Sequence, residues 1–140
     1  MMNQETFTIK NKTPTVETYR KLRRLSGLSP KTEEAAKAGL RGTLFAVQAF
    51  HRSEAVGMAR LIGDGGCHFQ VVDVAVLPEH QRKGLGQRMM AELKTYIDTH
   101  LPESAYISLI ADGHANKLYE KFGFRPVAPA SIGMYLRVDS

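Results

Sequence analysis

An apolar stretch of the chain runs from Val71 to Val76 and is interrupted only by Asp73. Its β-branched residues predict a buried strand, and Pro78 ends that strand because proline has no N–H to give to a ladder. A basic, glycine-containing turn follows. Beyond it, apolar residues recur at helical spacing and predict an amphipathic helix from Leu85 to about His100.

Two further helices are predicted before this strand. Thr15 and Thr32 are residue types that cap helix N-termini, and each precedes a stretch with helical spacing, over residues 16–25 and 33–40. Gly27 is a typical helix stop.

Strands are predicted on both sides of the long apolar stretch. Residues 7–9 alternate weakly, and residues 44–50, 55–62 and 67–76 follow one another with tight turns, as in an antiparallel meander. The strand over residues 106–110 comes after the helix, which implies a parallel crossover. A short helix over residues 115–122, a strand that begins at Phe124 and a strand over residues 134–138 complete the pattern. The prediction is an α/β (α+β) fold with a mixed sheet of six to seven strands. It is antiparallel at the N-terminal side, has a parallel pair near its centre, and is flanked by about four helices.

The turn before Leu85 has the chemistry of an anion site. The first backbone N–H groups of a helix lack internal partners, and the helix dipole favours negative charge there. Gly84 and Gly86 allow close approach of a ligand to the backbone, and Arg82 and Lys83 add positive charge. We therefore expect a pyrophosphate cradle, for ATP, a dinucleotide or coenzyme A.

The chain lacks the motifs that usually bind two of these ligands, ATP and a dinucleotide. A P-loop needs Ser or Thr after Gly-Lys, and Met89 replaces the third glycine of a dinucleotide fingerprint. The residues present, Gln81-Arg82-Lys83-Gly84-Leu85-Gly86, resemble the Q/R-x-x-G-x-G/A acyl-CoA motif of the GNAT superfamily of N-acetyltransferases. A second stretch, Leu-Tyr-Glu-Lys-Phe-Gly-Phe at residues 118–124, is similar to the second GNAT motif.

The resemblance covers about residues 43–137. Within it, Ala111-Asp112 and Gly133-Met134-Tyr135 look closest to a branch of small bacterial acetyltransferases and plant serotonin-type (aralkylamine) N-acetyltransferases. The resemblance implies a GNAT-like sheet and acetyl-CoA as co-substrate, and the spacing of the histidines predicts no metal. Asp112 stands where many GNATs have Asn, and Asn116 would then take over a contact to CoA. The acetyl-CoA contacts implied in this way are made by Val74, Ala75, Val76, Gln81, Arg82, Lys83, Gly84, Leu85, Gly86 and Asn116.

The resemblance makes Tyr119 the general acid that protonates the departing CoA thiolate. For a lone tyrosine, core packing would be the ordinary interpretation. The base that receives the ammonium proton is left open between Asp73 and Asp112, either directly or through water. Each of these aspartates is otherwise an ordinary hydrogen-bonded or solvated carboxylate.

Composition and charge indicate the number of domains, the type of ligand and the cellular compartment. A length of 140 residues suits a single domain over 1–140, and the net charge of +5 suits a polyanionic ligand. No nucleic-acid-binding motif accompanies this charge, and no metal-ligand spacing is found among the histidines. The single Cys67 fits a reducing compartment, and no apolar leader or span is seen, so we expect a cytoplasmic protein without membrane or nucleic-acid partners.

The expected activity is direct transfer of the acetyl group from acetyl-CoA to the primary amine of a small molecule, an aralkylamine or a polyamine. The alternatives are acetylation of amino-sugar antibiotics, acetylation of protein lysines or N-termini, and a non-catalytic module that only binds acyl-CoA. A homodimer is a further expectation, because Ile132, Met134, Tyr135 and Leu136 form an apolar end to the chain.

Overall fold

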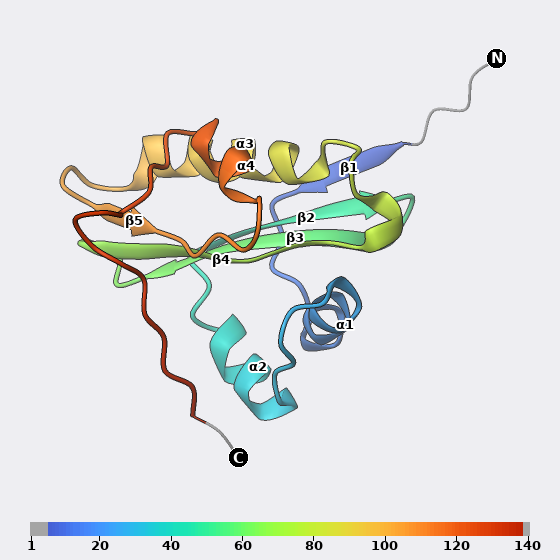
Figure 1. Ribbon diagram of the computed structural model, residues 1–140. Helices are drawn as coiled ribbons and strands as arrows, with labels where there is room; N and C mark the ends of the chain where they lie inside the picture. The colour runs from blue at the N-terminus through green and yellow to red at the C-terminus, as the bar shows by residue number, and fades with distance from the viewer. Residues whose placement is uncertain (1–5, 139–140) are drawn as a thin grey trace. The chain divides into compact units, whose positions relative to one another are not determined.

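The computed structural model describes residues 6–138 (Figure 1). The chain forms two compact units, divided in the sequence between Leu109 and Ile110. The prediction of a single domain over 1–140 stays a prediction. Each unit is described by itself.

The first unit is built on a sheet of five strands that lie in chain order. The first four strands pair antiparallel, and the fifth runs parallel to the fourth. The strands are β1 (Phe7–Lys10), β2 (Phe45–His51), β3 (Glu54–Gly63), β4 (His68–Val76) and β5 (Tyr106–Ser108).

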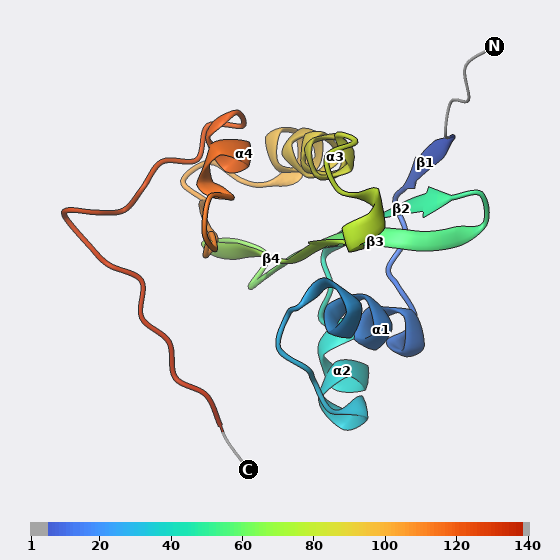
Figure 2. The same cartoon turned by 45° about the vertical axis from the view of Figure 1, so that its right-hand side comes forward.

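Three helices of this unit cover the two faces of the sheet. The helices α1 (Val16–Ser26) and α2 (Glu33–Leu40) lie on one face, and α3 (Leu85–His100) lies on the other (Figures 1 and 2). The predicted caps are confirmed: the Thr15 and Thr32 hydroxyls accept hydrogen bonds from backbone N–H groups three residues on, at 3.1 and 3.0 Å. Gly27 ends α1 in the left-handed conformation, with φ +88°.

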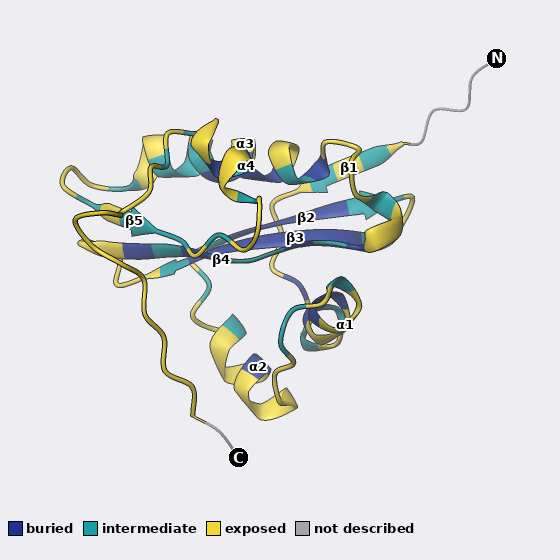
Figure 3. Cartoon of the chain, in the orientation of Figure 1, coloured by how far each residue is buried: buried dark blue, intermediate teal, exposed yellow. Residues whose placement is uncertain are grey.

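One part of the core of the unit lies between α3 and the sheet. Leu85, Met89, Met90 and Leu93 of α3 are almost fully buried, and so are the central residues of β2 and β3 (Figure 3). The fit is close at Gly57, where a Cβ would lie 3.2 Å from both the Met89 Cε and the Ala75 carbonyl oxygen. This packing fixes the position of the N-terminus of α3 relative to the end of β4.

One irregularity interrupts the pairing of β3 with β4. Met58 pairs with Ala75 and Arg60 pairs with Val72, so two residues of β4 stand opposite Ala59. Asp73, one of these two, has φ +58°. The feature is a β-bulge, which bends a strand and re-aims a side chain.

The second unit, from Ile110 on, contains one short helix, α4 (Asn116–Glu120). The strands predicted from Phe124 and over residues 134–138 are wrong for this structure, since no strand follows β5 in the described residues. The sheet consequently has five strands rather than six to seven, and its parallel pair is at the edge, not near the centre. The backbone N–H and C=O groups of a strand need partners on a neighbouring strand, and the segment after Phe124 pairs with no described strand.

No helix in the described part of the chain is both long and apolar enough to span a bilayer.

Candidate functional site

The connection between β4 and α3 consists of a short 3₁₀ helix, η1 (Pro78–His80), and a tight turn. The turn needs positive φ at two positions, +64° at Arg82 and +79° at Gly84. Glycine takes this conformation without strain. The Gln81 side chain closes the turn by donating from Nε2 to the Val76 carbonyl oxygen at 3.0 Å.

The N-terminus of α3 is left available to an anion. The first hydrogen bond of the helix runs from the Arg88 N–H to the Gly84 carbonyl at 3.0 Å, and no side chain caps the helix. The N–H groups of Leu85 and Gly86 therefore have no acceptor inside the helix. A Cβ on Gly84 would meet nothing within 4 Å, which leaves space for a ligand at the turn.

Basic side chains surround this turn, but not all of them face the same way. The Lys83 ammonium lies 5.6 Å from the centroid of the Phe7 ring, and the Arg88 guanidinium donates to the Phe7 carbonyl at 3.4 Å. Both cations are thus held against β1. Arg82 is exposed on the turn itself.

The second element of the site is the edge of β4. The parallel partner β5 pairs only with residues His68 to Gln70, so no described strand pairs with this edge from Val71 to Val76. On its other edge β4 pairs with β3 up to Val76, with the bulge at Asp73 between. An unpaired edge can accept an extended ligand that carries amide groups, as an added strand.

The edge and the helix N-terminus are contiguous in sequence and suit the two halves of an acyl-CoA. Backbone groups of Val74, Ala75 and Val76 would pair with the amides of the pantetheine arm. The N–H groups of the turn, from Arg82 to Gly86, would hold the pyrophosphate. The residues present therefore fit this ligand.

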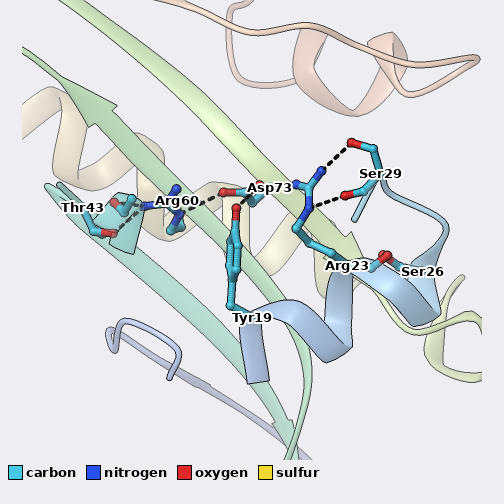
Figure 4. Close-up of polar contacts among 8 residues, drawn as sticks. Tyr19, Arg23, Ser26, Ser29, Thr43, Arg60 and Asp73 are labelled. Carbon is cyan, nitrogen blue, oxygen red and sulfur yellow. Dashed lines mark hydrogen bonds and ion pairs between the residues drawn. The ribbon is translucent and has the colours of Figure 1, made fainter. Parts of the chain in front are cut away.

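Asp73 lies at the centre of a buried ionic cluster (Figure 4). One carboxylate oxygen accepts hydrogen bonds from the Arg23 guanidinium at 2.5 Å and from the Tyr19 phenol at 3.1 Å. The other oxygen accepts from the Arg60 Nε at 2.9 Å. The side chains of Arg23, Asp73 and Arg60 are 9, 6 and 7% exposed. Burial together with the Asp73 charge raises the pKa of the Tyr19 phenol, so this phenol stays a donor.

The two arginines extend the cluster into the loops of the helical face. Arg23 donates to the Ser29 carbonyl at 2.7 Å and to the Ser29 hydroxyl at 3.0 Å. Arg60 donates to the Thr43 hydroxyl at 2.6 Å and to the Gly39 carbonyl at 3.3 Å (Figure 4). The cluster thereby ties the loop after α1 and the end of α2 to the bulge in β4.

This geometry changes the interpretation of Asp73. Both of its oxygens already accept charge-assisted or phenolic hydrogen bonds, so accepting a proton would break contacts between buried charges. The arrangement adds a positioning role for Asp73, and its role as a base stays a prediction. Sequence reasoning missed the partners Tyr19, Arg23 and Arg60. The available signal was Arg60, a charged residue inside an otherwise apolar strand that neighbours the strand of Asp73.

The other predicted site residues lie in the second unit. Tyr119 on α4 is buried and packs edge-to-face with Phe124, with ring centroids 6.3 Å apart. Burial, followed by the charge of Asp112, raises the pKa of the Tyr119 phenol, so the phenol is protonated at neutral pH. Asp112 is exposed, and the Asn116 amide donates to the Glu120 carboxylate at 3.2 Å. The roles of these three residues stay predictions.

Within residues 6–138, no group of three or more His, Cys, Asp or Glu side chains is arranged to hold a metal ion.

Known proteins are similar to this chain over most of its length. The family model described as the acetyltransferase (GNAT) domain matches residues 15–134. The chain is 46% identical to a probable acetyltransferase of unknown function from meticillin-resistant Staphylococcus aureus, with a TM-score of 0.90 over 95% of this chain and 100% of that one. A GNAT-family acetyltransferase from Streptococcus pneumoniae is 25% identical, with a TM-score of 0.76 over 96 and 98% of the two chains.

A more distant structure shares the fold alone: the ribosomal-protein-S18-alanine N-acetyltransferase of Escherichia coli. It is 20% identical, with a TM-score of 0.73 over 88% of this chain and 80% of that one. No curated protein matches the chain.

Proposed function

Since the chain belongs to the GNAT family and is therefore an acetyl-transferring enzyme, we propose that it moves the acetyl group of acetyl-CoA directly onto the primary amine of a small molecule. GNAT acetyltransferases use acetyl-CoA, and the open edge of β4 that leads into the Gly84 turn is the observation that carries the proposal. Because the chain is an enzyme, the alternative of a non-catalytic acyl-CoA module is set aside.

The residues of the first unit would bind and orient the co-substrate. The backbone of Val74 to Val76 would align the pantetheine arm, and a backbone N–H in this stretch would donate to the acetyl carbonyl as negative charge develops on its oxygen. One well-placed donor of this kind contributes about 3–4 kcal/mol. The N–H groups between Arg82 and Gly86 would hold the pyrophosphate, with Gln81 keeping the turn closed.

Tyr119 and Asp112 are proposed to handle the two protons of the reaction. Tyr119 is protonated at neutral pH and would give its phenolic proton to the departing thiolate. The attacking amine must first lose a proton. Asp112 is exposed and free of the ionic contacts that engage Asp73, so we propose Asp112, through water, as the acceptor of that proton.

The acceptor class is proposed from the loop after α1, which in GNAT folds borders the acceptor pocket. Arg23 fixes the loop at Ser29, and Arg20 donates to the Lys31 carbonyl at 3.0 Å. A loop that is tied down at two points suits a compact acceptor better than a polypeptide that must displace it. Aralkylamines and polyamines are the first acceptors to test.

The test is an assay of acetyl transfer against a broad panel of amines. The panel holds aralkylamines, polyamines, amino sugars, and peptides with a free N-terminus or lysine. The CoA thiol that the reaction releases is measured with a colorimetric thiol reagent, and the products are identified by mass spectrometry. We expect turnover of at least one small amine and none of the peptides. Turnover of peptides alone would overturn the proposed acceptor class.

A matched pair of variants tests the binding site separately. Gly84 and Gly27 both have strongly positive φ and open space at the Cβ position. Valine at either place imposes the same backbone strain. We expect Gly84→Val to weaken acetyl-CoA binding at least about tenfold in calorimetry, a loss of ~1.4 kcal/mol. Gly27→Val should leave binding near the wild-type value. Equal affinities in the two variants would place the pyrophosphate elsewhere.

A further inference from the structure

Within the ionic cluster of the first unit, Arg23 is the member that also holds the loop after α1 (Figure 4). All three nitrogens of its guanidinium donate hydrogen bonds. Nη1 donates to the Asp73 carboxylate at 2.5 Å, Nε to the Ser29 carbonyl at 2.7 Å, and Nη2 to the Ser29 hydroxyl at 3.0 Å. The Arg23 carbonyl also accepts from the Leu28 N–H at 2.9 Å, so the loop bends around this buried residue.

Asp73 connects this loop to the strand that is proposed to bind the co-substrate. It immediately precedes Val74, the first of the three residues whose backbone would align the pantetheine arm. Its own backbone takes φ +58° at the bulge, and both of its carboxylate oxygens accept hydrogen bonds from buried arginines. A displacement of the loop is therefore transmitted to β4 through the contact between Arg23 and Asp73.

Arg60 binds the same carboxylate but holds a different part of the chain. Its Nε donates to Asp73 at 2.9 Å, and its Nη1 donates to the Thr43 hydroxyl at 2.6 Å and to the Gly39 carbonyl at 3.3 Å. These two acceptors lie at the end of α2 and just after it. Arg23 and Arg60 are buried to the same degree, at 7 and 6% exposure. The two arginines differ in the segment that they hold.

We propose that Arg23 is a positioning residue for the amine, because it holds the loop after α1 at a fixed distance from Val74 and the thioester. The proposal rests on the acetyl transfer proposed above, with this loop beside the acceptor. Misplacement of a reactant by about 1 Å can cost about 100-fold in rate. A guanidinium suits this task, since its planar fork binds several acceptors in fixed directions, whereas an ammonium group is a single point charge.

The test compares Arg23→Lys with Arg60→Lys. Both substitutions keep a positive charge beside Asp73 and remove a buried guanidinium fork, so both should lower Tm by similar amounts. Arg23→Lys should lower kcat/KM for the amine at least about tenfold, with a higher KM for the amine, and keep the Kd of acetyl-CoA within about threefold of wild type. Arg60→Lys should keep all of these constants within about threefold, because its bonds do not reach the loop after α1.

Ser29→Ala tests the same contact from the loop and leaves the ion pairs of Asp73 intact. It removes the hydroxyl that accepts from Arg23 Nη2 and keeps the carbonyl that accepts from Nε. We expect kcat/KM for the amine to fall by about three- to tenfold, the effect of one hydrogen bond. In the Arg23→Lys background the same substitution should have no further effect, because the Nη2 donor is already absent.

Hydrogen exchange at Leu28 reports on the loop without any turnover. Its amide should exchange at least about tenfold faster in Arg23→Lys than in the wild type, and at the wild-type rate in Arg60→Lys. Equal effects of the two lysine substitutions on kcat/KM for the amine would overturn the proposal, and so would a wild-type exchange rate at Leu28 in Arg23→Lys.

The wild type distinguishes this outcome from failure of the proposed function. Turnover of peptides alone would overturn the acceptor class, and the two lysine variants would then be compared with the peptide as the amine. Absence of any acetyl transfer by the wild type would overturn the proposed function and the positioning role of Arg23 with it.

Discussion

Replacing Asp73 by Asn tests whether the ionic cluster stabilises the protein or serves as the catalytic base. The substitution keeps the shape of the side chain and removes its charge, while Arg23 and Arg60 stay buried at 9 and 7% exposure. Breaking a buried ion pair by removing one partner costs about 3–5 kcal/mol, because the other charge is left uncompensated. For a chain of 140 residues, one kcal/mol lowers Tm by about 3–4 °C. The expected fall in Tm is therefore about 10–20 °C.

The control is Asp98→Asn, the same chemical change in an exposed pair. Lys94 and Asp98 form an ion pair at 2.8 Å on the surface of α3, with side chains 38 and 56% exposed. Such pairs contribute about 0.3–0.5 kcal/mol, which predicts a change in Tm of about 2 °C or less. Both variants and the wild type are measured by differential scanning calorimetry under one set of conditions. Similar shifts in the two variants would refute the stabilising role of the cluster.

Activity measured well below the Tm separates the two roles of Asp73. A positioning residue should leave the pH dependence of kcat/KM in place and change KM for the amine, because the loop at Ser29 is released. A base should remove the acidic limb of the profile and lower kcat by about 10²–10⁴-fold. If Asp73→Asn loses the acidic limb of the kcat/KM profile and keeps the wild-type Tm, Asp73 acts as the base.

Three further predictions concern single side chains. Tyr119→Phe should lower kcat by about 10²–10⁴-fold with little change in acetyl-CoA affinity, and near-native kcat across pH would remove the acid role from Tyr119. Gly63→Ala should destabilise the β3–β4 hairpin by more than about 2 kcal/mol in urea unfolding, because its Cβ would lie 2.4 Å from the His68 carbonyl oxygen; an unchanged midpoint would contradict this contact. Three backbone N–H groups lower the pKa of Asp64 from its ordinary 3.8, so its stabilising effect is present above pH 3.8 and is lost as pH falls through the lower folded value. Asp64→Ala should therefore be less stable than wild type at pH 6, and the difference should shrink as the pH falls below 3.8. A difference in stability that does not change with pH would show that the charge of Asp64 is not its cause.

Much of the first unit could be predicted because its signals are local. Thr15, Thr32 and Gly27 define helix ends through hydrogen bonds and backbone angles that involve residues only a few positions away. The glycine turn before α3 is equally local. The parallel pairing of β4 with β5 is predicted from the helix that connects them, and the structure confirms it.

The bulge and its cluster could not be predicted because they depend on residues far apart in sequence. Val71 to Val76 are apolar on both sides of Asp73, so the sequence does not reveal that the strand changes phase there. The cluster joins Asp73 to Arg23, fifty positions earlier. The segment after Ser131 shows the opposite error: its alternation is real, but a strand forms only when an edge is present to receive it.

The bulge in β4 also determines where this strand tolerates a change in length. The pairings on its two sides differ by one position: Arg60 faces Val72, and Met58 faces Ala75. Deleting Asp73 would bring the two halves into a single register and leave every other pair intact. Deleting the other bulge residue, Val74, would have the same effect on the register, whereas deleting a paired residue inside β4 would turn the side chains beyond it to the wrong face of the sheet. The strand is in effect two half-strands of opposite phase that meet at the bulge residues Asp73 and Val74, and it can lose a residue from its interior only there.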